Sequence, residues 1–161
     1  MYETILVPVD GSDNAMNAVE EAAKLAKSFG STLQIVSVAT DQRYVQYGVT
    51  LGQDVMESFS ERAGEILDDA RDIAEKQGVK VETHFVVGVP KIQISKELPE
   101  KYDASLIVMG KSGVNGISRA ILGSTTAYVV RHSTVNVMVV DYKSSARRAP
   151  IRARSTRRSR Q

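Results

Sequence analysis

Five short apolar runs alternate with amphipathic segments along this chain. The runs span residues 4–10, 33–38, 79–87, 106–109 and 135–140, lengths typical of β-strands. In the segments between them, apolar residues recur every three or four positions, which is the period of a helix with one buried face. Helices that connect consecutive strands produce a parallel sheet covered on both faces. The order therefore predicts a single doubly wound α/β domain.

The first apolar run is almost continuous, as expected of a strand that is covered on both faces. Pro8 cannot donate a hydrogen bond to a neighbouring strand, so we place it near the carboxyl end of this strand. Ser12 or Asp13 is suited to cap the helix that follows, and Gly30 is suited to end it. The chain is therefore expected to open with a strand, a tight turn and a helix.

The later part of the chain repeats this alternation. The run at 79–87 alternates apolar and polar residues, so we expect one face to be exposed and the strand to lie near a sheet edge. Pro90 suits the first turn of a short helix that runs towards Leu98, and Pro99 follows where the helix must weaken. The last helix is predicted to begin at Ser124.

Size and composition limit the class of protein. The chain has 161 residues, of which 42% are hydrophobic, enough for one core. It has no cysteine, which excludes disulfides, thiolate metal sites and cysteine nucleophiles. No apolar run approaches the roughly 20 residues of a membrane span, and the amino terminus does not resemble a secretory signal. We therefore expect a cytoplasmic protein.

Charge is distributed unevenly. Residues 143–161 carry eight of the 21 Lys and Arg residues and no acid, which leaves 13 bases against 19 acids, about −6, for residues 1–142. An acidic body argues against a folded surface that grips nucleic acid. We expect a folded domain over residues 1–142 and a basic, largely disordered tail over 143–161.

A glycine-rich segment follows the fourth apolar run, from Gly110 to Thr126. Glycines allow backbone amides to approach a ligand closely, and the helix that opens at Ser124 directs its first amides at negative charge. Lys111, Arg119 and the hydroxyl of Ser112 could add further donors. The segment therefore predicts an anion site.

Three familiar motifs do not fit this segment. A Walker loop would need glycine at Ser105, and the nucleophile elbow of serine hydrolases would need glycine at Val114. The first strand is followed by Asp10-Gly11-Ser12 and lacks the dinucleotide fingerprint. The segment belongs to another kind of phosphate-binding scheme.

The spacing of the glycines is that of a known family. Gly110, Gly113 and Gly123-Ser124 follow a pattern of glycine, two residues, glycine, nine residues, then glycine and serine or threonine. Further matches are Ile5 to Ser12, Gly88 to Pro90, Leu106 to Gly110 and Val129 to His132. In these motifs the chain resembles the ATP-binding type of the universal stress protein family, from its first strand to about Tyr142.

The resemblance implies a Rossmann-like sheet of the adenine nucleotide α-hydrolase type, with strand order 3-2-1-4-5. Strands 1 and 4 are then neighbours whose connections diverge, which is where open α/β sheets bind ligands. The resemblance also implies the nucleotide-binding residues: Pro8, Val9, Asp10 and Val38 at the adenosine, Met109 and Gly110 near the ribose, and Gly113, Gly123, Ser124 and Thr125 around the phosphates.

The chain departs from the family pattern in two places. Ser112 stands where relatives often carry arginine or histidine, although Lys111 could return a positive charge nearby, and Asn136 stands where they often carry proline. Asp10, taken alone, could also be read as a helix-capping carboxylate. His84 and His132 have no partner at metal-ligand spacing, so we assign them structural or surface roles.

For function, the resemblance implies an ATP-binding stress-response protein that acts through a change of conformation, dimer state or partner, with Mg²⁺ or Mn²⁺ bridging the phosphates. One alternative is a family member that does not bind nucleotide and acts by interaction alone. Another is a slow ATP-hydrolysing enzyme on the same fold. No base stands beside a nucleophile, so we assign no catalytic residue and expect weak ATPase activity at most.

The sequence suggests two partners other than ATP, a second copy of the chain and an anionic surface. Strand 5 presents Val137, Val139 and Val140 at an expected sheet edge, and pairing from Val137 to Val140 with a second copy would cover that edge and form a homodimer. The basic tail could bind nucleic acid or an anionic surface, or it could be a solvated extension without a function.

Overall fold

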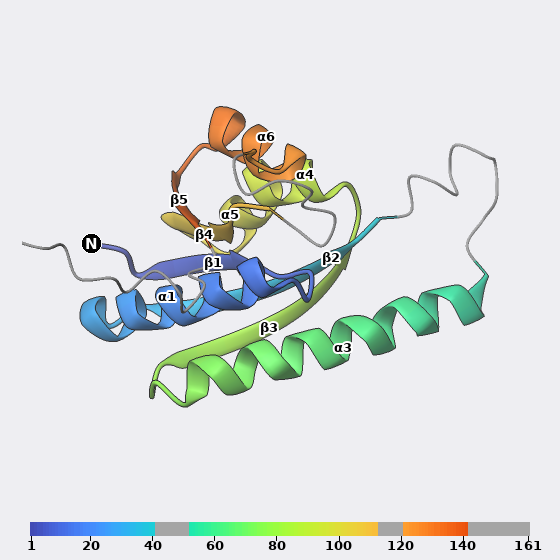
Figure 1. The fold of residues 1–161 in the computed structure, drawn as a ribbon, viewed down its shortest axis with the longest axis horizontal. Helices are drawn as coiled ribbons and strands as arrows, with labels where there is room; N and C mark the ends of the chain where they lie inside the picture. Colours follow the sequence, from blue (N-terminus) through green and yellow to red (C-terminus); the bar gives the residue numbers. More distant parts are fainter. Residues whose placement is uncertain (41–51, 113–120, 142–161) are drawn as a thin grey trace, which may run out of the picture.

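The computed structural model describes residues 1–40, 52–112 and 121–141 of the chain (Figure 1). Within these residues, five strands pair in parallel as one sheet in the order β3-β2-β1-β4-β5. The strands are β1 (Thr4–Pro8), β2 (Thr32–Ala39), β3 (Lys80–Val87), β4 (Leu106–Gly110) and β5 (Asn136–Val140). The predicted strand order and the edge position of β3 are therefore confirmed.

Helices cover both faces of the sheet, as Figure 1 shows. One face carries α1 (Asp13–Phe29) and α3 (Gln53–Glu75), and the other carries α6 (Ser124–His132) and a composite helix. The composite helix consists of α4 (Pro90–Ile92), the π-helical turn η1 (Gln93–Glu97) and α5 (Leu98–Lys101). The chain steps from β1 to β3 in one direction and then back past β1 to β5, so right-handed crossovers place the two sets of helices on opposite faces.

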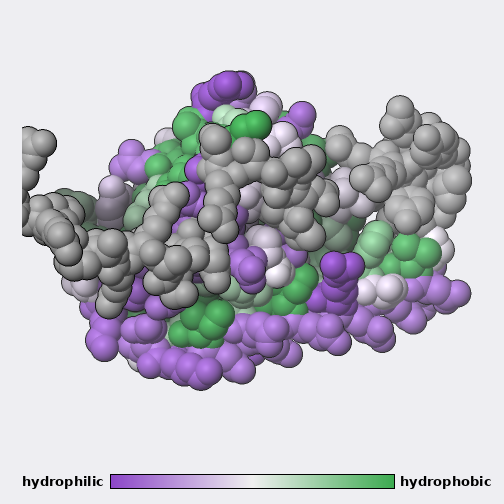
Figure 2. Space-filling view, in the orientation of Figure 1, coloured by the Kyte–Doolittle hydropathy of each residue, from purple (hydrophilic) through white to green (hydrophobic). Residues whose placement is uncertain are grey.

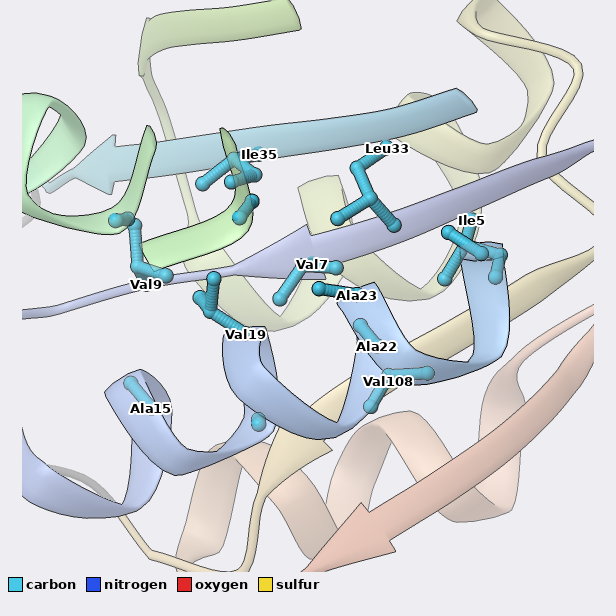
Figure 3. Close-up of a cluster of buried hydrophobic side chains, with 14 of the residues drawn as sticks. Ile5, Val7, Val9, Ala15, Val19, Ala22, Ala23, Leu33, Ile35 and Val108 are labelled. Carbon is cyan, nitrogen blue, oxygen red and sulfur yellow. The ribbon is translucent and has the colours of Figure 1, made fainter. Parts of the chain in front are cut away.

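Alternate residues of the central strands fill two separate hydrophobic cores. Figure 3 shows Ile5, Val7 and Leu33 on the side of the sheet that α1 covers. Leu6 points to the other side and packs in a second cluster with Val129 of α6. All five side chains are fully buried. Both faces of the central sheet are therefore covered by hydrophobic side chains, and polar side chains are found at the ends of the strands.

The two long helices begin and end where local sequence signals place them. Ser12 caps α1 by accepting a hydrogen bond from the Ala15 amide, and Gly30 ends it with φ of 70°, in the left-handed region that favours glycine. In α3, Leu67 and Ala70 are buried, whereas hydrophilic side chains line its outer side in Figure 2. The capping roles predicted for Ser12 and Gly30 are confirmed.

The helix after β3 extends beyond Leu98, towards which the sequence predicted it to run. It continues to Lys101 because the turn before Pro99 widens to π-helical geometry, in which the Leu98 amide donates to the Gln93 carbonyl. Pro99 has no amide to donate to Ser95, and its ring would crowd that carbonyl in a regular α-helix. The wide turn relieves both problems, so the proline is tolerated within the helix.

β5 lies at the sheet edge, as predicted, but its exposed apolar side chain is not one of the predicted valines. Met138 is 37% exposed, Val137 and Val139 are half-buried, and Val140 is only 6% exposed. Val140 belongs to the core beneath α1, because alternate residues of the strand point into the two cores. The predicted edge position of the strand is therefore confirmed, but the side chain of Val140 adds nothing to an exposed apolar surface.

Some predicted features fall outside the described residues. They are Gly113 and Arg119 of the glycine-rich segment and the basic tail at 143–161. The roles given to them stay predictions. None of the helices that the structure describes is long and apolar enough to cross a membrane.

Candidate functional site

A cavity of about 460 Å³ lies at the carboxyl ends of the central strands. The predicted site residues that line it are Pro8, Val9, Asp10, Val38, Met109, Gly110, Gly123, Ser124 and Thr125. They come from three strand ends and from the start of α6, so the fold brings together segments that are more than 100 residues apart in sequence. Gly113, the remaining predicted residue, lies outside the described residues.

Pro8 explains why the sheet opens at this point. In the described residues, β1 pairs with β4 only at Ile5 and Leu6, whereas its pairing with β2 continues to Pro8. The Val9 amide donates to the Val36 carbonyl on the β2 side at 2.8 Å. Backbone groups alternate along a strand, so the nitrogen of Pro8 faces β4, where a donor is not needed. β1 and β4 therefore separate at the cavity without leaving an unpaired amide.

Asp10 and Ser12 form a tight turn on the rim of the cavity. The backbone N–H and the hydroxyl of Ser12 both donate to Asp10 Oδ1, at 3.0 and 2.6 Å. Gly11 between them has φ of 82°, which a residue with a side chain rarely adopts. Asp10 thus lines the cavity and also organises the cap of α1, so the two readings of this residue are not exclusive. With Asp13 in the first turn, the amino terminus of α1 already has acidic neighbours.

The amino terminus of α6 differs from that of α1. Its N-cap is Gly123, which supplies no side-chain cap, and its first turn contains no acid. The first amide with an intrahelical partner is that of Ala127, which donates to the Gly123 carbonyl at 2.8 Å. Among the described residues, the preceding amides of Ser124, Thr125 and Thr126 therefore have no helical acceptor. These three residues line the cavity.

Two other backbone amides of the glycine-rich segment are already bonded within the protein. Lys111 N–H donates to the Val140 carbonyl at 2.8 Å, and Gly123 N–H donates to the Lys111 carbonyl at 2.9 Å. The sequence predicted an anion cradle from Gly110 to Ser124. The amides of Lys111 and Gly123 are therefore not available to an anion, whereas those of the first turn of α6 have no helical acceptor among the described residues.

Lys111 does not return a positive charge to the cavity. Its ammonium pairs with Asp141 Oδ2 at 3.3 Å, and it is not among the described lining residues. Lys111 continues the direction of β4 beside β5, so its side chain reaches the residue just after β5. Asp141 also accepts, through its backbone carbonyl, a hydrogen bond from Asn17 at 2.9 Å. The positive charge of Lys111, which the sequence suggested for a phosphate, instead forms an ion pair that links the ends of β4 and β5.

An apolar wall completes the side of the cavity next to β2. Val36, Val38, Ile94 and Met109 contribute to it, and Ile94 comes from the π-helical turn. The Val36 carbonyl accepts a hydrogen bond from the Val9 amide, so the backbone polar groups of Val36 face β1. Those of Val38, two residues further along the strand, face the same side. Its N–H and C=O thus point into the gap beyond the last β1–β2 hydrogen bond of the described residues.

Sequence reasoning did not assign some of the residues that line the cavity. These are Ser12, Ala15, Val36, Thr40, Pro90, Ile94 and Thr126, whereas the Ser112 hydroxyl was expected to add a donor. Strand alternation could have found Val36, because it shares a face with Val38. Ile94 gave no such signal, since a π-helical turn shifts the side chains away from regular helical positions.

Comparisons with known proteins agree with this geometry. Residues 1–141 match the universal stress protein family. A Staphylococcus saprophyticus protein named as a universal stress protein is 38% identical over 144 residues, which cover 86% of this chain and 83% of that protein. A solved universal stress protein in complex with cAMP has a TM-score of 0.67 and 29% identity, over 88% of this chain and 98% of that one. The Archaeoglobus fulgidus universal stress protein in complex with dAMP has a TM-score of 0.65 and 26% identity, over 86% and 98%. This chain therefore belongs to the universal stress protein family.

Proposed function

We propose that this chain binds ATP in the cavity between β1 and β4, and that occupancy changes its conformation, its dimer state or its choice of partner in a stress response. The adenine lies towards β2 and the phosphates lie at α6. The observation that carries the proposal is the amino terminus of α6, whose first three residues line the cavity and have amides without helical acceptors. Such an end combines free donors with the positive pole of the helix dipole.

The two helix termini at the cavity set the direction of the nucleotide. The start of α1 has Asp10 and Asp13 beside it, which repel a phosphate, whereas the first turn of α6 has no acid. The hydroxyls of Ser124 and Thr125 lie at the same end of the cavity and add donors. The phosphates are therefore expected at α6 and the base at the opposite, apolar end.

The base end favours adenine. Val38 offers a backbone N–H and C=O side by side, and the surrounding wall of Val36, Ile94 and Met109 is apolar. On the edge that carries N7, adenine presents its N6 amino donor next to the N7 acceptor, which complements the N–H and C=O of Val38. Guanine presents two acceptors, O6 and N7, on the same edge. The cAMP and dAMP complexes of the solved relatives support an adenine ligand in this fold.

A divalent ion would depend on the nucleotide for its ligands. The described residues contain no group of three or more His, Cys, Asp or Glu side chains that could hold a metal. Asp10 is the one carboxylate among the described lining residues. Mg²⁺ characteristically binds through one or two carboxylates, water and substrate phosphates. A Mg²⁺ or Mn²⁺ ion bound with the nucleotide would therefore take most of its ligands from the phosphates and water, and it would neutralise the phosphate charge.

Titration calorimetry with ATP, ADP, AMP and adenosine, with and without Mg²⁺, tests the proposal. Gly123→Val is the informative variant, since a Cβ at Gly123 would lie 3.1 Å from the Cα of Ser112 and displace the start of α6. We expect ATP to bind at least about tenfold more weakly, the effect of losing one hydrogen bond to a charged group, and adenosine to bind as before.

The matched control is Gly64→Val on α3, where a Cβ would meet nothing within 4 Å. It is expected to bind ATP like the parent chain. If Gly123→Val also binds ATP like the parent chain, the phosphate assignment is wrong. If the parent chain binds no nucleotide, the protein acts by interaction alone. If it binds ATP and releases phosphate at steady state, it is instead an ATPase.

The proposed function includes a homodimer that pairs β5 with β5 of a second copy. β5 is an edge strand, and Met138 on it and Val130 on α6 are exposed to 37% and 48%. An edge strand with exposed apolar side chains is a template for pairing. Dimerisation through residues 137–140 would cover it.

A further inference from the structure

Asn14 and Ser112 meet at the phosphate end of the cavity although they are 98 residues apart. The side-chain amide of Asn14, in the first turn of α1, donates to Ser112 Oγ at 2.7 Å, and the contact is partly buried. The backbone of Asn14 also packs directly on the end of β4: a Cβ at Gly110 would lie 2.8 Å from the carbonyl carbon of Asn14. Glycine at this position therefore allows α1 to hold Asn14 in place.

Ser112 also adjoins the start of α6. Its Cα would lie 3.1 Å from a Cβ at Gly123, the N-cap residue, and Ser112 lines the cavity. Its hydroxyl is therefore on the same rim as the amides of Ser124 and Thr125. A donor at this point adds to the donors of the helix end.

The Asn14 contact determines what the Ser112 hydroxyl can do. A hydroxyl has one proton to donate and two lone pairs that accept. Since the Asn14 amide occupies one lone pair, the hydroxyl proton is not used in that contact, and among the described residues it has no acceptor. It remains available for an acceptor in the cavity.

Resting on the nucleotide-binding function proposed above, we infer that Ser112 donates a hydrogen bond to a phosphate of the nucleotide and that Asn14 is its positioning residue. Asn14 takes no part in binding itself. It fixes the Ser112 hydroxyl as a donor and ties the start of α1 to the phosphate end of the cavity.

The test compares adenosine with AMP by calorimetry, because only AMP carries a phosphate. The measured quantity is the ratio of their dissociation constants in the full chain. Ser112→Ala is expected to lower AMP affinity about tenfold, the effect of one hydrogen bond to a charged group, with adenosine affinity unchanged. Ser112→Thr keeps the hydroxyl and should retain most of the AMP affinity. Asn14→Ala is expected to lower AMP affinity about threefold, since the hydroxyl remains but is less well oriented.

A double-mutant cycle separates positioning from direct contact. If Asn14 acts only through Ser112, the double variant Asn14→Ala, Ser112→Ala binds AMP like Ser112→Ala alone. Asn14→Asp should lower AMP affinity more than Asn14→Ala, because a carboxylate accepts the Ser112 proton and repels the phosphate. Asn17→Ala is the matched control: this asparagine lies on the same helix and bonds the Asp141 carbonyl instead. It should bind AMP like the parent chain.

Each outcome decides the inference. Unchanged affinity of Ser112→Ala for both AMP and ATP contradicts the phosphate contact, and additive losses in the double variant contradict the positioning role. In both cases adenosine and AMP still bind the parent chain, so the proposed function stands. If the parent chain binds neither ligand, the proposed function fails and the inference fails with it.

Discussion

At the scale of single residues, His84 on β3 is a partly buried titratable side chain that lies away from the cavity and is hydrogen-bonded within the sheet. Its Nε2–H donates to Gln34 Oε1 at 2.6 Å, and the Gln34 amide donates to Glu82 at 3.0 Å. The ring stacks on Tyr102 with a centroid separation of 4.4 Å. Burial lowers the pKa of His84, the charge of Glu82 raises it less, and Lys101 lowers it further. His84 is therefore held neutral in the folded protein, as a structural residue.

This lowered pKa predicts a pH dependence of stability. The unfolded chain binds a proton at His84 more readily than the folded protein does, so the contribution is complete above the ordinary histidine pKa of about 6.5 and is lost as pH falls below it. We expect the free energy of unfolding, measured with urea, to fall from pH 7.5 to pH 5. His84→Gln should fall less steeply over this range.

His132→Gln, at an exposed position on α6, serves as the histidine control and should follow the parent chain. A His84→Gln variant with the parent's pH dependence would show that other groups cause it. The pKa of Glu82 is lowered, chiefly by its hydrogen bond from Gln34, so its contribution to stability is lost only at acidic pH, where carboxylates are protonated. It does not explain a loss that begins near neutrality.

At the scale of elements, the sequence predicts most of the fold because its signals are local. The caps at Ser12 and Gly30 and the helix start at Ser124 depend on adjacent residues, and each is found where predicted. The sequence indicates that the helix weakens at Pro99, but it does not show that the helix widens to a π-helical turn and continues. The partner of Lys111 could not be predicted, since it depends on how closely the ends of β4 and β5 approach.

The candidate site was predicted in part for the same reason. Its glycine spacing and Asp10 are visible in the sequence, and the described members gather at one cavity. Ile94 and Asn14 carry no motif. Their positions follow from the π-helical turn and from the packing of α1 on Gly110, which only the folded structure reveals.

The junction between α6 and β4 yields a prediction at this scale. Thr126 is 3% exposed, and its hydroxyl donates to the Gly110 carbonyl at 2.9 Å. Thr126→Val keeps the shape but leaves that buried carbonyl without this donor, so we expect a loss of about 1–3 kcal/mol in the free energy of unfolding. Thr125→Val, without such a bond among the described residues, should change it by less than about 0.5 kcal/mol. Equal urea midpoints for both variants would show that the bond does not stabilise the junction.

At the scale of the whole molecule, the proposed dimer is tested at its edge strand. Met138→Lys places a charge on β5, which natural edge strands use to prevent pairing. We expect the parent chain to sediment as a dimer at micromolar concentration and the variant to dissociate at least about tenfold more readily, since an unpaired buried charge costs more than 1.4 kcal/mol.

Val87→Lys is the matched control, because Val87 is similarly exposed, at 36%, on β3 at the opposite edge of the sheet. It should leave the mass of the parent chain unchanged. A parent chain that sediments as a monomer contradicts the proposed dimer, and dissociation by Val87→Lys alone would place the interface at the other edge.

The proline at the end of β1 has a consequence for how a ligand enters. A residue with a backbone amide in place of Pro8 could donate a hydrogen bond to β4 and extend the pairing of β1 with β4. A ligand would then have to break that pairing to enter the cavity. With proline there, the extended pairing has no donor. The opening is consequently built into the covalent structure of the chain, so the cavity has its shape before any ligand occupies it.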